Sequence, residues 1–258
     1  MTIDFGFLPQ VFLLVLLRVS AVVGIVAFFG GATVPAAIRM GLAVLLALAL
    51  PPGVPPQWYA AAGNLRTLPD VLYAATGELL LGAAVGLICD ALIAACLLAG
   101  DIISLQSGLG ASTEVDPISG ETNPLPAGLL QSLVILIVIL NNGHLVLVKL
   151  LAQSLYSIPP GEAWLPAKAV LTLLSVSGWA YEAGFKLAAP VLAAAMIVNT
   201  AFGLVARLAP DFDILFLALP VRLLAGLFSF ALVLRYGAPL ISRMIQDTLR
   251  GCAWVLAR

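Results

Sequence analysis

The sequence predicts an all-α, polytopic integral membrane protein with about six apolar helical segments, several of them broken. Of its 258 residues, 62% are hydrophobic and only 10% are charged, whereas soluble chains carry about 25% charged residues. The mean hydropathy is +1.12. A soluble domain of this length could not bury so much apolar surface. The formal net charge of −1 argues against a nucleic-acid-binding protein, which would show a basic patch.

The first two segments lie before a proline-rich break. Residues 8–29 are long enough to cross a hydrocarbon layer about 30 Å thick. Because Arg18 falls inside this apolar run, we expect a retained helix rather than a cleavable signal peptide. A second, shorter segment covers residues 38–50 and includes Arg39 near its start. Five residues of the run 51–56 are proline or glycine, which ends this helix.

The third segment, residues 69–100, would be about 45 Å long if wholly helical. It contains two acids, Glu78 and Asp90. Gly82 and Gly86 are four residues apart, a spacing that lets another helix approach closely.

A polar stretch, residues 101–126, follows this helix. Up to residue 121 it holds four acids and neither lysine nor arginine. The run from Asp116-Pro117 to Gly120 has turn chemistry. Long connections without regular structure are usually functional or disordered. Two hypotheses remain open: a solvated connector between membrane helices, or a loop that enters a pore lined by other subunits.

Three further segments complete the predicted helices. Residues 129–151 are interrupted at Asn141-Asn142-Gly143, which predicts a broken helix or tight hairpin. Residues 168–207 are too many for one span, and we expect Pro190 to divide them. Residues 214–236 form the sixth segment. The basic tail beyond it and the acidic loop at 101–121 fall on opposite sides after about six crossings, so the positive-inside rule places the C-terminus in the cytoplasm.

The cysteines predict neither a disulfide framework nor a metal site. Cys89 and Cys96 are seven residues apart on one helical face, about 10 Å along the axis, which is too far for a disulfide. Cys252 lies alone near the C-terminus. No Ser-His-Asp order, phosphate-binding glycine motif or metal-ligand cluster is visible, so we expect no enzyme activity, no catalytic residue and no cofactor.

Ionisable residues inside apolar segments are functional candidates because lipid does not solvate them. Glu182 and Lys186, four residues apart, can pair on one helical face. We expect most of these charges to pair between helices or between subunits. The alternative is a secondary transporter that uses intramembrane acids for ion coupling, although no inverted repeat is evident. The candidates are Arg18, Arg39, Glu78, Asp90, Lys149, Glu182, Lys186, Arg207 and Arg222.

The order of short motifs along the chain resembles the FliR family, the flagellar branch of the FliR/SctT export-gate proteins of type III secretion. The resemblance covers nearly the whole chain. Ser107 and Phe212-Asp213 depart from the pattern of many flagellar members, so the injectisome branch stays an alternative. The motifs are Leu17-Arg18-Val19-Ser20, Val34-Pro35, Glu78 with Gly82 and Gly86, Asp116-Pro117 with Gly120, Asn142-Gly143-His144, Ala188-Ala189-Pro190-Val191 and Arg207 with Ala209-Pro210.

The resemblance implies a FliP-like part at 1–160 and a FliQ-like helical hairpin with a basic tail at 161–258. It also implies a subunit of an export gate in the bacterial inner membrane, built with FliP-type, FliQ-type and FlhB-type subunits, that passes unfolded proteins. A loop that plugs the closed pore would match residues 106–123. The corresponding plug residues are Gln106, Gly108, Gly110, Glu114, Asp116, Pro117 and Gly120.

Overall fold

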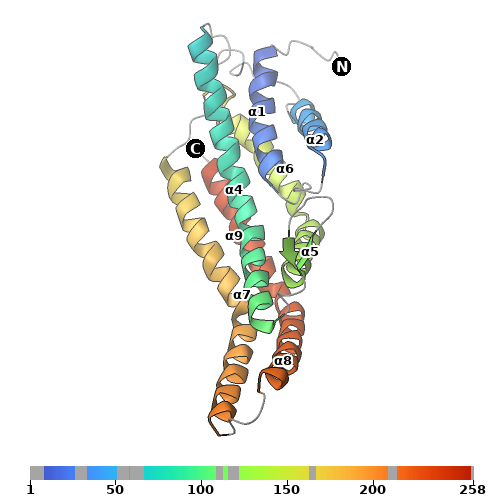
Figure 1. Ribbon diagram of the computed structural model, residues 1–258. Helices are drawn as coiled ribbons and strands as arrows, with labels where there is room; N and C mark the ends of the chain where they lie inside the picture. The colour runs from blue at the N-terminus through green and yellow to red at the C-terminus, as the bar shows by residue number, and fades with distance from the viewer. Residues whose placement is uncertain are drawn as a thin grey trace. The chain divides into compact units, whose positions relative to one another are not determined.

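Within the part of the chain that the structure describes, the protein is helical apart from one small hairpin (Figure 1). The computed structural model describes residues 9–26, 34–50, 58, 67–108, 113–115, 122–162, 167–208 and 214–256. Two three-residue strands, β1 (Thr113–Val115) and β2 (Thr122–Pro124), pair antiparallel with Glu114 opposite Asn123. The helices are α1 (Pro9–Ile25), α2 (Ala36–Ala49), α4 (Leu68–Ser107), α5 (Leu125–Leu140), α6 (Gly143–Ser157), α7 (Ala167–Leu208), α8 (Ile214–Tyr236) and α9 (Ala238–Leu256).

The chain forms two compact units, each assembled from segments of both halves of the sequence. The first comprises Met1–Ala91, Asn142–Ser177 and Asp247–Arg258. The second comprises Leu92–Asn141 and Gly178–Gln246. Helices α4, α7 and α9 each contribute to both units.

The first unit is built around α1, which lies beside α2 and the first part of α4 (Figure 1). Val11, Val15, Val19 and Val22 on α1 are completely buried, and their spacing of three and four residues places them on one helical face. They belong to one hydrophobic core with apolar residues of α2, α4, α6 and the end of α9. Burial of this apolar face holds the helices of the unit together.

Two glycines of α4 allow α1 to pack closely. A Cβ atom added at Gly82 would lie 2.5 Å from the Arg18 carbonyl oxygen, and one at Gly86 would lie 2.9 Å from the Ile25 Cβ. Neither position has room for a side chain. The predicted close approach at this pair of glycines is therefore confirmed, and its partner is α1.

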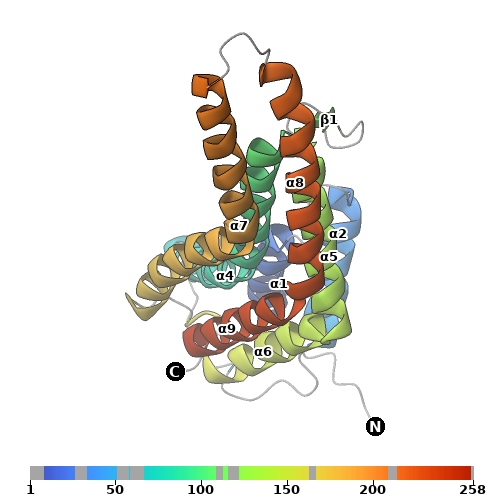
Figure 2. The same ribbon diagram turned by 90° about the horizontal axis from the view of Figure 1, so that it is seen from below.

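In the second unit, too, helices pack closely against each other at glycine positions. A Cβ at Gly100 would overlap the backbone of Ala127 on α5, and one at Gly226 on α8 would overlap Ser107 on α4. The part of α7 that belongs to this unit runs beside α8 (Figure 2). Side chains larger than hydrogen would force these helices apart.

Two predictions about helix bounds are wrong. Helix α4 continues to Ser107, seven residues into the predicted loop, because Ile103, Ser104 and Ser107 are buried in a helical pattern. It ends at Gly108, whose φ of 77° is open to glycine. Helix α7 is continuous through Pro190, since proline removes one hydrogen bond without always ending a helix. The basic tail, whose secondary structure was not predicted, is largely helix α9.

The helices confirm the membrane assignment but not the count of six crossings. Among the described residues, three helices are long and apolar enough to span a membrane: Leu68–Ser107, Ala169–Leu208 and Phe216–Tyr236. The number rises to four if α5 and α6 together form one broken span. Their break falls at Asn141-Asn142, as the sequence predicts, and Asn142 has a left-handed φ of 54°.

Candidate functional site

A buried ion pair lies at the centre of the first unit. Arg18 of α1 is 1% exposed and Glu78 of α4 is 0% exposed. The Arg18 Nε donates to Glu78 Oε2 at 2.6 Å, and Arg18 Nη2 donates to Glu78 Oε1 at 3.1 Å. This two-point geometry is the strongest form of an arginine–carboxylate pair.

The pair is completed by groups at the C-terminal end of α6. Arg18 Nη1 donates to Ser154 Oγ at 3.3 Å, and Nη2 donates to the Ile158 carbonyl oxygen at 3.1 Å. The Gly161 backbone N–H donates to Glu78 Oε1 at 2.9 Å. We call Arg18, Glu78, Ser154, Ile158 and Gly161 the buried ionic cluster. Because it joins α1, α4 and α6, it fixes the positions of three helices at once.

Helical periodicity brings the two charged residues together. Arg18 falls among the buried positions of α1, next to Val15 and Val19. Glu78 precedes buried Leu81 by three residues, and therefore lies on the same face of α4. A charge on a buried face is stable only when it is paired and hydrogen-bonded. The cluster meets that requirement, and both carboxylate oxygens of Glu78 already accept hydrogen bonds.

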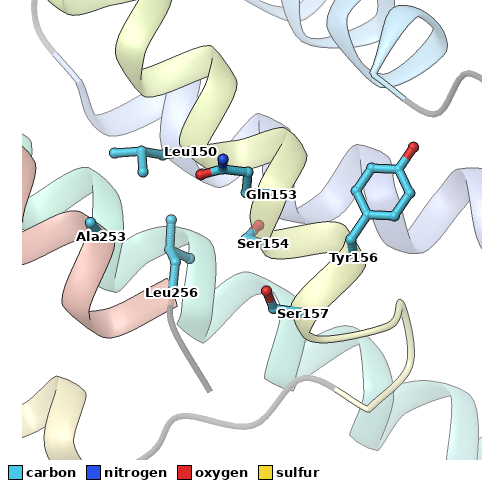
Figure 3. A pocket seen from close by; sticks show the side chains of 7 residues that line it. All are labelled: Leu150, Gln153, Ser154, Tyr156, Ser157, Ala253 and Leu256. Atoms are coloured by element: carbon cyan, nitrogen blue, oxygen red, sulfur yellow. The ribbon is translucent and has the colours of Figure 1, made fainter.

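A pocket of about 500 Å³ opens next to the cluster. Helix α6 contributes Leu150, Gln153, Ser154, Tyr156 and Ser157, and the end of α9 contributes Ala253 and Leu256 (Figure 3). Figure 2 shows α6 beside α9. Its lining residues are all uncharged, so the pocket offers hydroxyl and amide groups but neither an acid nor a base.

Other predicted polar residues lie outside the cluster. Arg39 of α2 is half-buried and donates to the Gly24 carbonyl oxygen at 3.3 Å. Asp90 is half-buried on α4, while Lys149 and Arg207 are exposed.

Two polar pairs involve the part of α7 that belongs to the second unit, one within α7 and one between α7 and α8. Glu182 and Lys186 form the ion pair that their spacing predicts, at 2.5 Å, with side chains 62% and 61% exposed. Arg222 of α8 donates to Asn199 Oδ1 of α7 at 2.5 Å. Both pairs face outward from helices that are long and apolar enough to span a membrane.

The predicted plug residues are described only in part. Gln106 is half-buried in the last turn of α4, and Gly108 is exposed at its end. The backbone of Glu114 belongs to β1. Gly110, Asp116, Pro117 and Gly120 lie outside the described residues.

Sequence reasoning missed several members of these contacts. Ser154, Ile158 and Gly161 were not predicted as partners of the charged pair. Cys252, predicted to lie alone, contacts Cys89. The sequence held no signal for Ser154, because its hydroxyl donates to the Leu151 carbonyl oxygen of its own helix at 2.7 Å and needs no further partner.

Comparison with known proteins gives one consistent result. The family model described as "Bacterial export proteins, family 1" matches residues 10–248. The chain is 30% identical to the flagellar biosynthetic protein FliR of Escherichia coli (strain K12) over 233 residues, which covers 90% of this chain and 87% of that protein. It is 30% identical to the FliR of Caulobacter vibrioides over 227 residues, with 86% and 87% covered. It is 29% identical to the FliR of Bacillus subtilis over 217 residues, with 82% and 81% covered.

Proposed function

Because this chain belongs to the bacterial export proteins of family 1, the family of the flagellar biosynthetic protein FliR, we propose that it is a membrane subunit of the flagellar type III export gate. In this role it forms part of the channel for unfolded substrate proteins. The observation on which the proposal depends is the family match over residues 10–248, nearly the whole chain. The family consists of export proteins rather than enzymes, in agreement with the expected lack of catalytic residues.

The buried ionic cluster supports a scaffolding role over ion coupling. An ion-coupling acid must exchange its proton or cation with water during transport. Glu78 is fully buried and is held by Arg18 and by the Gly161 N–H. Breaking such a pair leaves an uncompensated buried charge. We therefore assign Glu78 and Arg18 to the internal architecture of the subunit rather than to a transport cycle.

The outward-facing polar pairs of α7 and α8 support a subunit with protein neighbours. Glu182 and Lys186 are more than half exposed within a helix apolar enough to span a membrane. Charges in such helices rarely face lipid and usually face protein or a water-filled cavity. The proposal supplies such neighbours as FliP-type, FliQ-type and FlhB-type subunits. It assigns residues 1–160 to a FliP-like part and 161–258 to a FliQ-like hairpin with its C-terminal helix.

The stretch between α4 and α5 is proposed as the plug of the closed pore. Its β1–β2 pairing, with Thr113 opposite Pro124 and Val115 opposite Thr122, gives the base of the stretch a defined shape. An isolated two-stranded hairpin is marginally stable, so it can be displaced when cargo enters. The proposed location is the bacterial inner membrane with the C-terminus in the cytoplasm.

Deletion of the gene in its own bacterium tests the proposed function. We expect flagellar filament protein to disappear from the culture medium while it still accumulates inside the cell. Expression of the wild-type chain from a plasmid should restore secretion. Normal secretion in the deletion strain, with loss of uptake or efflux of a small solute instead, would contradict the proposal and support a secondary transporter.

A charge-neutral variant of Glu78 distinguishes a scaffolding role of this residue from a role in ion coupling. Glu78→Gln keeps a side chain of similar shape but removes the negative charge opposite Arg18. If the cluster is architectural, the amount of assembled complex should fall, and the complexes that do form should export at the wild-type rate. Normal assembly combined with lost export would show that Glu78 acts during transport.

A further inference from the structure

Two cysteine thiols that are far apart in the sequence meet in the core of the first unit. The Sγ atoms of Cys89 on α4 and Cys252 on α9 lie 3.3 Å apart, although 163 residues separate them in the chain. Both side chains are buried, with exposed fractions of 2% and 0%. Cys252 Sγ also lies 3.9 Å from the Val85 carbonyl oxygen. The two sulfur atoms are thus in direct contact.

The packing around Cys252 holds this contact in place. A Cβ added at the neighbouring Gly251 would be in van der Waals contact with the Ile88 side chain of α4, at 3.5 Å, so α9 packs against the side chains of α4 at this point. Val255 and Leu256, in the next turn of α9, belong to the same hydrophobic core as Cys89. Neither thiol takes part in the buried ionic cluster or in the proposed transport function.

We propose that Cys89 and Cys252 form a dithiol modification site, which a small two-electron oxidant of the diazenedicarboxamide class converts to a disulfide. The two S–H bonds break and one S–S bond forms. The oxidant accepts the two electrons and two protons across its N=N bond and becomes the corresponding hydrazine. A disulfide needs sulfur atoms about 2.0 Å apart, so the two side chains have only a short distance to close.

The disulfide fastens the end of α9 to α4. In the reduced protein, non-covalent contacts hold this last part of the chain, and buried thiols behave as small apolar groups. In the oxidised protein, a covalent bond links the C-terminal helix to α4, and a thiol reductant reverses it. The reaction is slow because the reactive form is the thiolate and because the oxidant must reach a buried site.

The third cysteine provides a matched control within the same chain. Cys96 is equally buried, at 0% exposed, but within the described residues it has no thiol neighbour, and all three cysteines are free. The Cys96→Ser chain therefore keeps Cys89 and Cys252 and has no other cysteine. The Cys252→Ser chain lacks the proposed site.

Peptide mapping tests the site directly. Membranes containing the Cys96→Ser chain are treated with diamide, blocked with N-ethylmaleimide, denatured and digested with trypsin without a reductant. Cys89 then lies in the fragment 67–149, and Cys252 lies in the fragment 251–258. We expect these two fragments to appear as one disulfide-linked species that dithiothreitol separates. The Cys252→Ser chain should give no such species.

Counting thiols in the wild-type chain provides a second measurement that does not depend on the Cys96→Ser variant folding. Maleimide mass tags added after denaturation should fall from three per chain to one after oxidation of the folded protein. The remaining thiol should be Cys96. If all three thiols stay reactive after oxidation, or if oxidation links Cys96 as often as Cys89, the proposal is wrong. Pairing that occurs only when the chain is unfolded before oxidation would also overturn it.

Discussion

Replacing Glu78 with leucine should strongly destabilise the first unit. The substitution leaves Arg18, 1% exposed, as a buried charge without its counter-ion, which typically costs about 3–5 kcal/mol. It also removes the acceptor of the Gly161 N–H, at a further cost of about 1 kcal/mol. Since about 1.4 kcal/mol corresponds to a factor of ten, the ratio of folded to unfolded protein should fall by about a thousandfold or more.

A double-mutant cycle measures how much of this loss comes from the pair itself. In the Arg18→Met/Glu78→Leu chain both charges are gone, and apolar replacements of buried ion pairs are often tolerated. We expect the double variant to be more stable than the Glu78→Leu variant, by about 2 kcal/mol or more. The assay is denaturant unfolding of the purified protein in detergent, followed by tryptophan fluorescence.

An exposed ion pair outside the spans serves as the control. Arg250 and Asp247 of α9 are 3.4 Å apart, and their side chains are 76% and 51% exposed. Asp247→Asn should therefore change the free energy of unfolding by less than about 1 kcal/mol. If Glu78→Leu were as mild as this control, or if the losses of the two single variants simply added in the double variant, the reasoning about the buried ionic cluster would be refuted.

Three further predictions concern the second unit and the break before α6. Gly100→Ala should prevent folding, because the added Cβ would overlap the backbone of Ala127, whereas Gly128→Ala, with nothing within 4 Å, should fold normally; yields of monodisperse protein compare the two. Asn142→Gly should leave the unfolding midpoint unchanged or slightly raised, because glycine readily adopts the φ of 54° found there. Deletion of residues 110–120 should leave assembly intact but raise ion conductance through membranes that contain the complex. Equal conductance with and without the deletion would refute the plug.

Local sequence features predicted much of the helical architecture. The sixth apolar segment, 214–236, has the bounds of α8. The Asn141-Asn142-Gly143 break separates α5 from α6, because a residue with positive φ cannot continue a helix. The ion pair between Glu182 and Lys186 depends only on a four-residue spacing. Each of these features is decided by residues close together in the chain.

Long-range pairings could not be predicted in the same way. Arg18 and Glu78 are 60 residues apart, and Arg18 and Ser154 are 136 residues apart. An apolar helix with a charge in its middle shows that a partner exists, but its own sequence does not identify that partner. The same reason explains why Cys252 seemed isolated, although it contacts Cys89.

Helix ends were also difficult to predict where polar residues continue a buried face. Asp101, Gln106 and Ser107 resembled the beginning of a loop, yet α4 extends through them. Ser107 satisfies its hydroxyl by donating to the Ile103 carbonyl oxygen at 2.7 Å. A hydroxyl that bonds back to its own helix needs no other partner, so serine at this position does not end the helix.

The mass of the assembled complex shows whether this chain is a subunit of a larger export gate. The chain is co-expressed with FliP-type and FliQ-type proteins from the same bacterium, purified through a tag on this chain alone, and weighed intact by native mass spectrometry. We expect one species that contains this chain together with both other subunits. A stable, monodisperse monomer or homo-oligomer of this chain, recovered without either of the other proteins, would contradict this expectation.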